Sequence, residues 1–389
     1  MKLLLDTFFA TVALSHLMVD TLNGQRAILL TYLSGPLGLN NTAIGTATTI
    51  YILSAALAQP FFGWVTDRLG ARWVVAGGVL WMAVFFSLAL IIPGQLSLLL
   101  FVIASAGSGA FHPAGTMQAT LRGQTHFSGR QNSAASYFFV FGQMGFFFGP
   151  IIAGPLLDRF QTPGLLLVCI PAFIIGLTAI LTLKQPEQAN PGHSVPHQSF
   201  RFASHIGIKS FIAFILFACF QSWAVQNLAT FIPKYLFDLG QSASSYGLLT
   251  GLAMGLSAVG NVLGAQLADR FGKRPVSFIS LFLASVPIVL IPFAKNIDWL
   301  YILIPLAGLL IGAVNSIVVV QAQGYIPGGM GLASGLILGI LFSSGAIGTL
   351  LAGKIADVWG FTPVFYLTAV LALAASICVL ANHEKKLVV

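Results

Sequence analysis

Long apolar runs separated by short polar turns make up nearly the whole chain. A helix needs about 20 apolar residues to cross the hydrocarbon core of a membrane, and by that measure the sequence predicts twelve spans. They are expected at residues 8–33, 43–66, 73–93, 97–121, 132–157, 163–183, 208–237, 245–268, 275–294, 299–322, 330–356 and 361–381. The longest polar segment follows the sixth run, which predicts an all-α membrane protein with domains at 1–183 and 208–389 and a cytoplasmic linker at 184–207.

Composition and charge agree with a membrane protein. Of the 389 residues, 57% are hydrophobic and only 7% are charged, whereas roughly 25% of a soluble domain is charged. The net charge of +8 does not indicate a nucleic-acid partner, because the basic residues lie in turns between apolar runs. If both termini are cytoplasmic, thirteen of the 18 lysines and arginines lie inside and four outside. That bias follows the positive-inside rule and predicts a multi-pass protein of the bacterial inner membrane.

A ten-residue turn is repeated in the two halves. Residues 63–72 and 265–274 resemble each other, and Asp269 lies 202 residues after Asp67. Weaker copies at 154–159 and 353–357 end the fifth and eleventh spans, so they face the opposite side of the membrane from the stronger pair. Three-helix units that recur inverted within each half are typical of secondary transporters. The sequence therefore predicts two pseudo-symmetric six-helix bundles.

The stronger turn resembles the cytoplasmic signature of the major facilitator superfamily. Gly63, Asp67, Gly70 and Arg72 match its glycine, aspartate, glycine and basic positions, whereas Ala265 replaces the first glycine in the second copy. Glycine allows close helix approach and tight reversal, and an aspartate can accept hydrogen bonds from a helix N-terminus and pair with an arginine. The resemblance implies a conformational latch between the halves, formed by Gly63, Asp67, Arg68, Gly70, Arg72, Asp269, Arg270, Gly272 and Arg274.

Two further stretches resemble parts of the same superfamily. Gly145, Gly149, Pro150 and Gly154 look like its antiporter-type helix motif, although a generic packing face of small residues remains the alternative. The triplet 111–113, Phe-His-Pro, together with a histidine and an aspartate in the first span, resembles the fosmidomycin-resistance branch of bacterial drug exporters. An arginine that many proton-driven exporters carry in the fourth span is replaced here by isoleucine, so no arginine-assisted proton route is expected there.

The candidate proton-coupling residues are Asp20, His16 and His112. Asp20 is the acidic residue that lies near the middle of a predicted span, and ionisable groups at that depth are functional candidates. His16 lies one turn away on the same helix face, and His112 lies at mid-depth in the fourth span. The alternatives are a His–Asp pair that only satisfies itself, and a histidine bonded to the carbonyl that Pro113 leaves free.

Candidate substrate-binding residues are the polar or aromatic side chains of the spans. Arg26 could attract an anionic substrate or simply offset Asp20. Packing and interhelical hydrogen bonds remain the alternative for the others. The set comprises Arg26, Phe111, His112, Gln143, Trp223, Gln226 and Asn315.

No enzyme signature stands out, and no metal or cofactor is expected. The linker histidines His193, His197 and His205 lack neighbouring cysteine or carboxylate ligands. The chain is interpreted as an alternating-access transporter, a monomer in contact with membrane lipid, that exports a small amphipathic or anionic compound in exchange for protons. The alternatives are an uptake symporter or uniporter, and a non-transport receptor or lipid-handling protein on the same scaffold.

Overall fold

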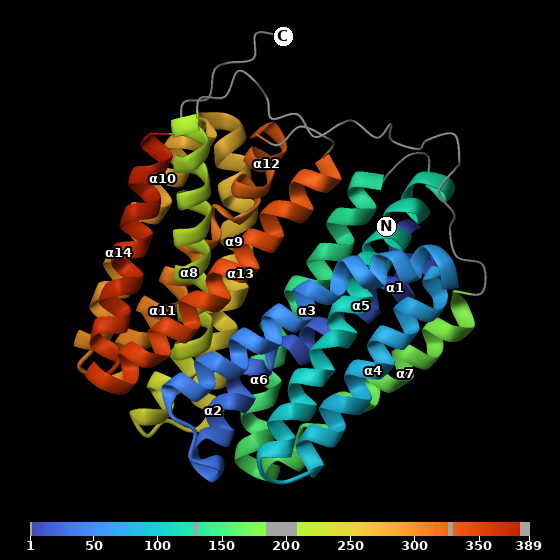
Figure 1. The fold of residues 1–389 in the computed structure, drawn as a ribbon, viewed down its shortest axis with the longest axis horizontal. Coiled ribbons are helices and arrows are strands. Elements are labelled where there is room, and N and C mark those ends of the chain that lie inside the picture. Colours follow the sequence, from blue (N-terminus) through green and yellow to red (C-terminus); the bar gives the residue numbers. More distant parts are fainter. Residues whose placement is uncertain (1, 128–130, 184–207, 326–329, 382–389) are drawn as a thin grey trace. The chain divides into compact units, whose positions relative to one another are not determined.

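The computed structural model describes residues 2–127, 131–183, 208–325 and 330–381, and the regular elements within these ranges are all helices (Figure 1). Helices suit a chain of this composition because the hydrocarbon offers no water to backbone N–H and C=O groups. The elements are η1 (Lys2–Leu5), α1 (Thr7–Gly24), α2 (Arg26–Leu37), α3 (Asn41–Leu69), α4 (Ala71–Ile91), α5 (Gln95–His126), α6 (Gln131–Gly164), α7 (Leu166–Thr182), α8 (Ile208–Asp238), α9 (Ala243–Phe271), α10 (Lys273–Leu290), η3 (Ile291–Phe293), α11 (Ile297–Gly312), α12 (Asn315–Tyr325), α13 (Met330–Trp359) and α14 (Phe361–Leu380).

Each predicted span coincides with a helix or a pair of helices. Ten helical segments of the described chain are long and apolar enough to cross a membrane, and α7 is a shorter apolar helix. The first span is divided between α1 and α2 at Gln25, and the tenth between α11 and α12. The predicted all-helical membrane architecture is therefore confirmed, with these two spans subdivided.

The repeated turns contain the expected reversals at their second glycines. Gly70 separates α3 from α4 with φ of 85°, and Gly272 precedes α10 with φ of 93°, a left-handed region that favours glycine. A Cβ added to Gly63 would meet no atom of the described residues within 4 Å, and the close helix approach expected at Gly63 stays a prediction. The side chain of Asp67 lies outside the described part, so its expected bond to Arg72 stays a prediction.

The chain divides into two compact units. The first comprises residues 1–194 and 233–251, and the second comprises residues 195–232 and 252–389. The predicted linker falls outside the described residues, and the predicted domain boundaries stay predictions. In the second unit α10 packs against α11 and α14, and α13 packs against α12 and α14.

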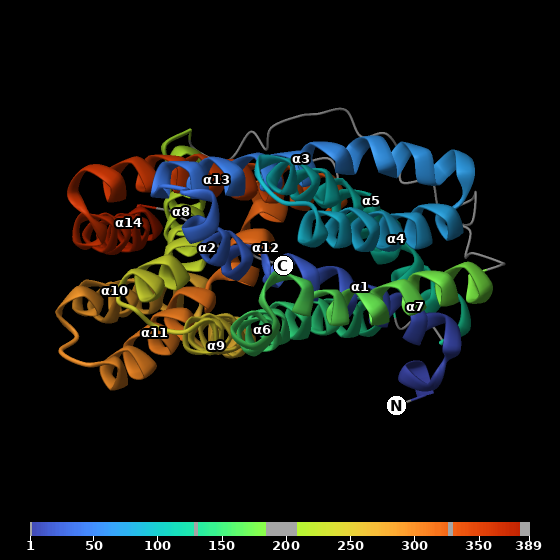
Figure 2. The same ribbon diagram turned by 90° about the horizontal axis from the view of Figure 1, so that it is seen from below.

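Helix α1 is the central element of the first unit. It packs against α4, α5, α6 and α7, as the view in Figure 2 shows. At its start Asp6 accepts the Phe9 N–H at 2.8 Å and two hydrogen bonds from Arg122 of α5, at 3.0 and 2.9 Å. Burial raises the pKa of Asp6, but these hydrogen bonds and the arginine charge outweigh it and hold the pKa below its usual value. The ion pair therefore ties α1 to α5.

Candidate functional site

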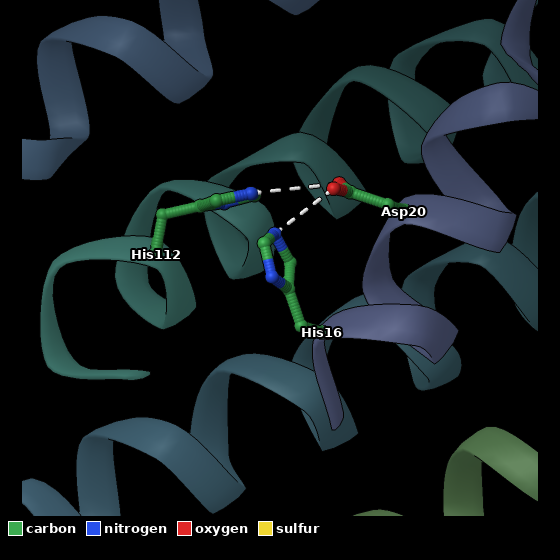
Figure 3. Close-up of side chains that lie close together, drawn as sticks. All are labelled: His16, Asp20 and His112. Atoms are coloured by element: carbon green, nitrogen blue, oxygen red, sulfur yellow. Dashed lines mark ion pairs between the residues drawn. The ribbon is translucent and has the colours of Figure 1, made fainter. Parts of the chain in front are cut away.

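Three protonatable side chains meet in the core of the first unit (Figure 3). His16 and Asp20 lie one turn apart on α1, and His112 comes from α5. His16 Nε2 lies 3.0 Å from Asp20 Oδ2, and His112 Nε2 lies 3.5 Å from Asp20 Oδ1. His16 and Asp20 are only 2% and 3% exposed. The structure thus brings together the three residues that the sequence singled out for proton coupling.

The backbone determines how both imidazoles face the carboxylate. His16 Nδ1 lies 2.7 Å from the carbonyl oxygen of Phe138, and His112 Nδ1 lies 2.8 Å from that of Ser108. Because a carbonyl only accepts, Nδ1 must carry the proton in each ring. In a neutral ring Nε2 would then present a lone pair to an ionised carboxylate. A bound proton on a histidine or on Asp20 removes such a conflict, so this geometry favours a cluster that holds protons.

The carbonyl bonded to His112 differs from the one expected. Pro113 lacks an N–H and therefore leaves the carbonyl of Gly109, four residues earlier, without its helical donor. His112 instead donates to the carbonyl of Ser108 and lies 3.3 Å from the Ser108 hydroxyl. The alternative of a histidine that merely satisfies the carbonyl freed by the proline is wrong.

Aromatic rings pack against both histidines, and the side chain of His112 remains 27% exposed. The His16 ring stacks on Phe138, with centroids 3.9 Å apart, and lies 5.7 Å from Phe111. The His112 ring meets Phe111 edge-on at 5.6 Å. Phe111, a candidate substrate-binding residue, is fully buried and packs against the histidines, and substrate binding by it stays a prediction.

Glycines of α6 allow α1 to pack closely against α6 beside His16 and Asp20. A Cβ added to Gly142 would lie 2.5 Å from the His16 ring and 2.7 Å from Asp20 Oδ2. One added to Gly145 would lie 2.6 Å from the Leu17 carbonyl oxygen, and one added to Gly149 would lie 2.4 Å from that of Thr21. Gly154 instead faces the start of α9, within 2.3 Å of the Ala243 carbonyl oxygen by the same measure, and Pro150 lies inside α6. The antiporter-type role of the motif stays a prediction, but its first two glycines seat the helix that carries the cluster.

Neutral polar residues that the sequence did not single out complete the site. Asn23 donates from Nδ2 to Asp20 Oδ1 and to the Ser108 hydroxyl, both at 2.9 Å. The Tyr51 hydroxyl, from α3, donates to Asn23 Oδ1 at 2.8 Å. Asn23 was within reach of sequence reasoning, since it lies three residues after Asp20 on the same helix face. Tyr51 carries no such signal because only the tertiary fold brings it near.

Arg26 forms no ion pair with Asp20. Its guanidinium lies over the Tyr51 ring, 5.4 Å from the centroid, and its Nε is buried without a hydrogen-bond partner among the described residues. The neighbouring amide of Gln25 is also buried and unpartnered there. Of the two roles considered for Arg26, a direct offset of Asp20 by an ion pair is therefore not observed.

Comparison with known proteins settles the family. The model of the Major Facilitator Superfamily matches residues 8–240 and 212–387. The chain belongs to this superfamily. It is 25% identical to the fosmidomycin resistance protein of Escherichia coli K12, with 93% of this chain and 89% of that protein covered. It is 23% identical to a gentisate transporter of Corynebacterium glutamicum, covering 89% and 81%.

Solved structures share the fold at low identity. A bacterial homologue of the human lysosomal transporter Spinster matches with a TM-score of 0.77 and 14% identity, covering 96% of this chain and 93% of that one. The nucleoside transporter NupG matches with a TM-score of 0.77 and 15% identity, covering 97% and 100%. As a superfamily member with transporters as relatives, the protein is a multi-pass secondary transporter of small molecules and not an enzyme.

The remaining candidate substrate residues of this superfamily member lie apart from the cluster or in the second unit. Gln143 is exposed on α6. Asn315 accepts a hydrogen bond from Gln221 at 2.8 Å. Trp223 and Gln226, on α8, lie against two glycines of α13. Interhelical packing accounts for these contacts, and substrate binding by these residues stays a prediction.

The weaker copy of the superfamily signature makes the contact that was expected of the stronger one. Asp158 accepts the backbone N–H groups of Ala243 and Ser244 at 2.9 and 2.8 Å, and the Ser244 hydroxyl at 2.5 Å. It thereby caps the N-terminus of α9 within the first unit. A carboxylate at that position satisfies free N–H groups and complements the helix dipole.

The cluster is also the one group in the described residues whose spacing suits a metal ion. One ligand atom from each of His16, Asp20 and His112 lies within 4.8 Å of the others. No metal was expected from the sequence. We interpret the cluster as a proton site, because Asn23 already donates to one Asp20 oxygen and His16 Nε2 lies at hydrogen-bond distance from the other.

Proposed function

We propose that the protein is a proton-coupled exporter of small amphipathic or anionic compounds in the bacterial inner membrane, working by alternating access. The observation that carries this proposal is the contact of two histidines, His16 and His112, with opposite oxygens of one buried carboxylate, Asp20. A carrier driven by protons needs a group that binds a proton in one conformation and releases it in another. Each of the three side chains, two imidazoles and one carboxylate, can bind a proton, so the cluster suits that task.

Arg26 supports an anionic substrate. A partly buried cation whose Nε is buried and without a hydrogen-bond partner in the described residues is stabilised by a bound anion. The unpartnered amide of Gln25 beside it adds hydrogen-bonding capacity. In the proposed cycle the substrate binds near Arg26 while Asp20 is deprotonated, and proton binding at the cluster accompanies its release outside.

Export rather than uptake is supported by the relatives. They include proteins named for fosmidomycin resistance and multidrug resistance, and a transporter confers resistance when it removes a compound from the cell. Exposed apolar side chains such as Leu57, Leu167 and Ile302 support a surface that contacts membrane lipid. We propose that the monomer is the transporting unit.

The test is transport by purified protein in liposomes, with fosmidomycin and gentisate as the first probes because relatives are named for them. An imposed proton gradient should drive either probe toward the more acidic compartment in exchange for protons. Asp20→Asn should abolish this accumulation while leaving exchange between equal pools of probe intact. Asp298→Asn, at an exposed carboxylate on α11, is the matched control and should behave as wild type.

Two outcomes would contradict the proposal. Accumulation by Asp20→Asn against a gradient, with an unchanged pH dependence, places the coupling group elsewhere. Movement of probe in the same direction as protons indicates an uptake symporter.

A further inference from the structure

We infer that Asn23 and Tyr51 are positioning residues of the proton site. Asn23 lies where α1, α3 and α5 meet around Asp20, and the residue is only 8% exposed. Its Nδ2 bonds Asp20 Oδ1 on α1 and the Ser108 hydroxyl on α5, and its Oδ1 accepts from Tyr51 on α3. The Tyr51 hydroxyl thereby holds an N–H donor against the carboxylate and stabilises its ionised form.

The chemistry of the three partners determines the orientation of the amide. A primary amide has two N–H donors on nitrogen and an acceptor on oxygen. Both donors of Asn23 are used, one by Asp20 and one by Ser108, and the oxygen receives the tyrosine proton. The flipped amide would set its oxygen against the carboxylate of Asp20, two acceptors at 2.9 Å. The observed orientation is therefore the one in which every contact pairs a donor with an acceptor.

The asparagine also adjoins the second proton-binding side chain. Ser108, which accepts from Asn23, contacts His112 Nδ1 through its hydroxyl at 3.3 Å and through its carbonyl at 2.8 Å. One amide thus touches the carboxylate directly and His112 through a single serine. Loss of the Tyr51 hydrogen bond to Asn23 is expected to change the protonation of Asp20 more than that of His112, because Asp20 bonds Asn23 directly.

The groups around Asp20 determine the direction of the effect. Among the described residues they are His16 on α1, His112 on α5 and Tyr51 on α3, with Arg26 of α2 beyond the Tyr51 ring. From α6 come uncharged groups, the Phe138 carbonyl and Gly142. Hydrogen bonds to an ionised group are stronger than those to its neutral form. Removing the Asn23 donor therefore favours protonated Asp20, and protonation should occur at higher pH.

The decisive variant is Tyr51→Phe. It deletes the hydroxyl that anchors Asn23 but keeps the ring that lies under Arg26 and 4.9 Å from Phe101. A charge-assisted hydrogen bond that is largely lost corresponds to a shift of about one pH unit. Infrared difference spectroscopy of the purified protein measures this without a substrate, by following with pH the protonated-carboxyl band that disappears in Asp20→Asn. Tyr51→Phe and Asn23→Leu should both move its midpoint to higher pH, by about one unit.

Tyr246→Phe provides the matched control. Tyr246 is as buried as Tyr51, but its hydroxyl has no hydrogen-bond partner in the described chain. A merely structural effect of losing a buried hydroxyl would appear in this variant too, whereas the midpoint should stay unchanged. Elution as a single species from a gel-filtration column checks folding, and if Tyr51→Phe fails to fold, Asn23→Leu carries the measurement.

This inference rests on the proposed function only in taking Asp20 as a group that binds and releases a proton. The experiments distinguish failure of the positioning role from failure of the transport proposal. An unchanged midpoint in both Tyr51→Phe and Asn23→Leu, or a shift to lower pH, overturns the positioning role and leaves the transport proposal intact. An Asp20 band that never titrates while the protein stays folded overturns the proton role and this inference with it. Normal coupling in Asp20→Asn, together with an Asp20 band that titrates in wild type and shifts in Tyr51→Phe, overturns Asp20 as the coupling group of transport and leaves Asn23 and Tyr51 as residues that position a titrating carboxylate.

Discussion

The glycine face of α6 offers the most direct test of how the cluster is built. In Gly145→Ala the added methyl would lie 2.6 Å from the Leu17 carbonyl oxygen, 2.7 Å from the Thr21 nitrogen and 2.8 Å from the Asp20 carbonyl carbon. All three atoms belong to the backbone of α1, so no side chain can rotate away. To restore an ordinary contact of 3.4 Å, α1 must retreat by about 0.8 Å. Overpacking of this kind costs about 1–3 kcal/mol.

Gly77→Ala is the control for this substitution. Gly77 lies inside α4, where an added Cβ meets no atom of the described chain within 4 Å, and alanine there should stabilise the helix by up to about 1 kcal/mol. Equilibrium unfolding in mixed detergent–SDS micelles gives the free energy of unfolding of both variants. The free energy of unfolding of Gly145→Ala should be about 1–3 kcal/mol below that of wild type. This variant should lose transport even where it is folded, because His16 and Asp20 move with α1. Equal unfolding free energies for the two variants, with full transport, would refute the packing role of Gly145.

Three further substitutions test other contacts. Arg26→Gln should reduce transport of anionic probes about tenfold more than that of neutral ones, and an equal loss for both would indicate a structural role. Asp6→Asn keeps the cap on α1 but loses the ion pair with Arg122, so its free energy of unfolding should be about 1 kcal/mol below that of wild type at neutral pH. Because the pKa of Asp6 is held low, this difference should persist down to about pH 4. At lower pH the difference should disappear as Asp6 of the wild type becomes protonated. Asp158→Asn should speed hydrogen exchange of the Ala243 and Ser244 amides about tenfold, and unchanged exchange would show that the cap adds no protection.

The fold could be predicted because the membrane imposes a simple rule on the sequence. Each span must hide its backbone polar groups, so apolar run length alone located the helices. Two details escaped this rule. The chain breaks at Gln25 within a polar stretch, residues 23–26, that apolar run length alone included in one span, and a Cβ added to Gly63 meets no atom of the described residues within 4 Å. A glycine in a motif shows that a side chain is absent, but only the fold shows whether a neighbour occupies the space.

The charged half of the site was predictable for a related reason. Ionisable residues are rare at mid-membrane depth, so Asp20, His16 and His112 stand out from their surroundings. The neutral half was predictable only in part. Asn23 lies on the Asp20 face of α1, which is a local signal, but asparagine, serine and tyrosine occur throughout the spans, and nothing local separates Tyr51 from residues that only bridge two helices.

The glycine face and the polar network depend on each other. Three protonatable side chains can share protons only if α1 and α5 hold them within hydrogen-bond distance in a dry environment, where unpaired polar groups are costly. Gly142 lets α6 close over His16 and Asp20 because it contributes no side chain, and Phe138 of the same helix supplies the carbonyl that orients His16. A larger residue at 142 would therefore separate His16 from its backbone acceptor as well as from its carboxylate. The absence of a side chain on α6 is thus as much a part of the proton site as the groups that titrate.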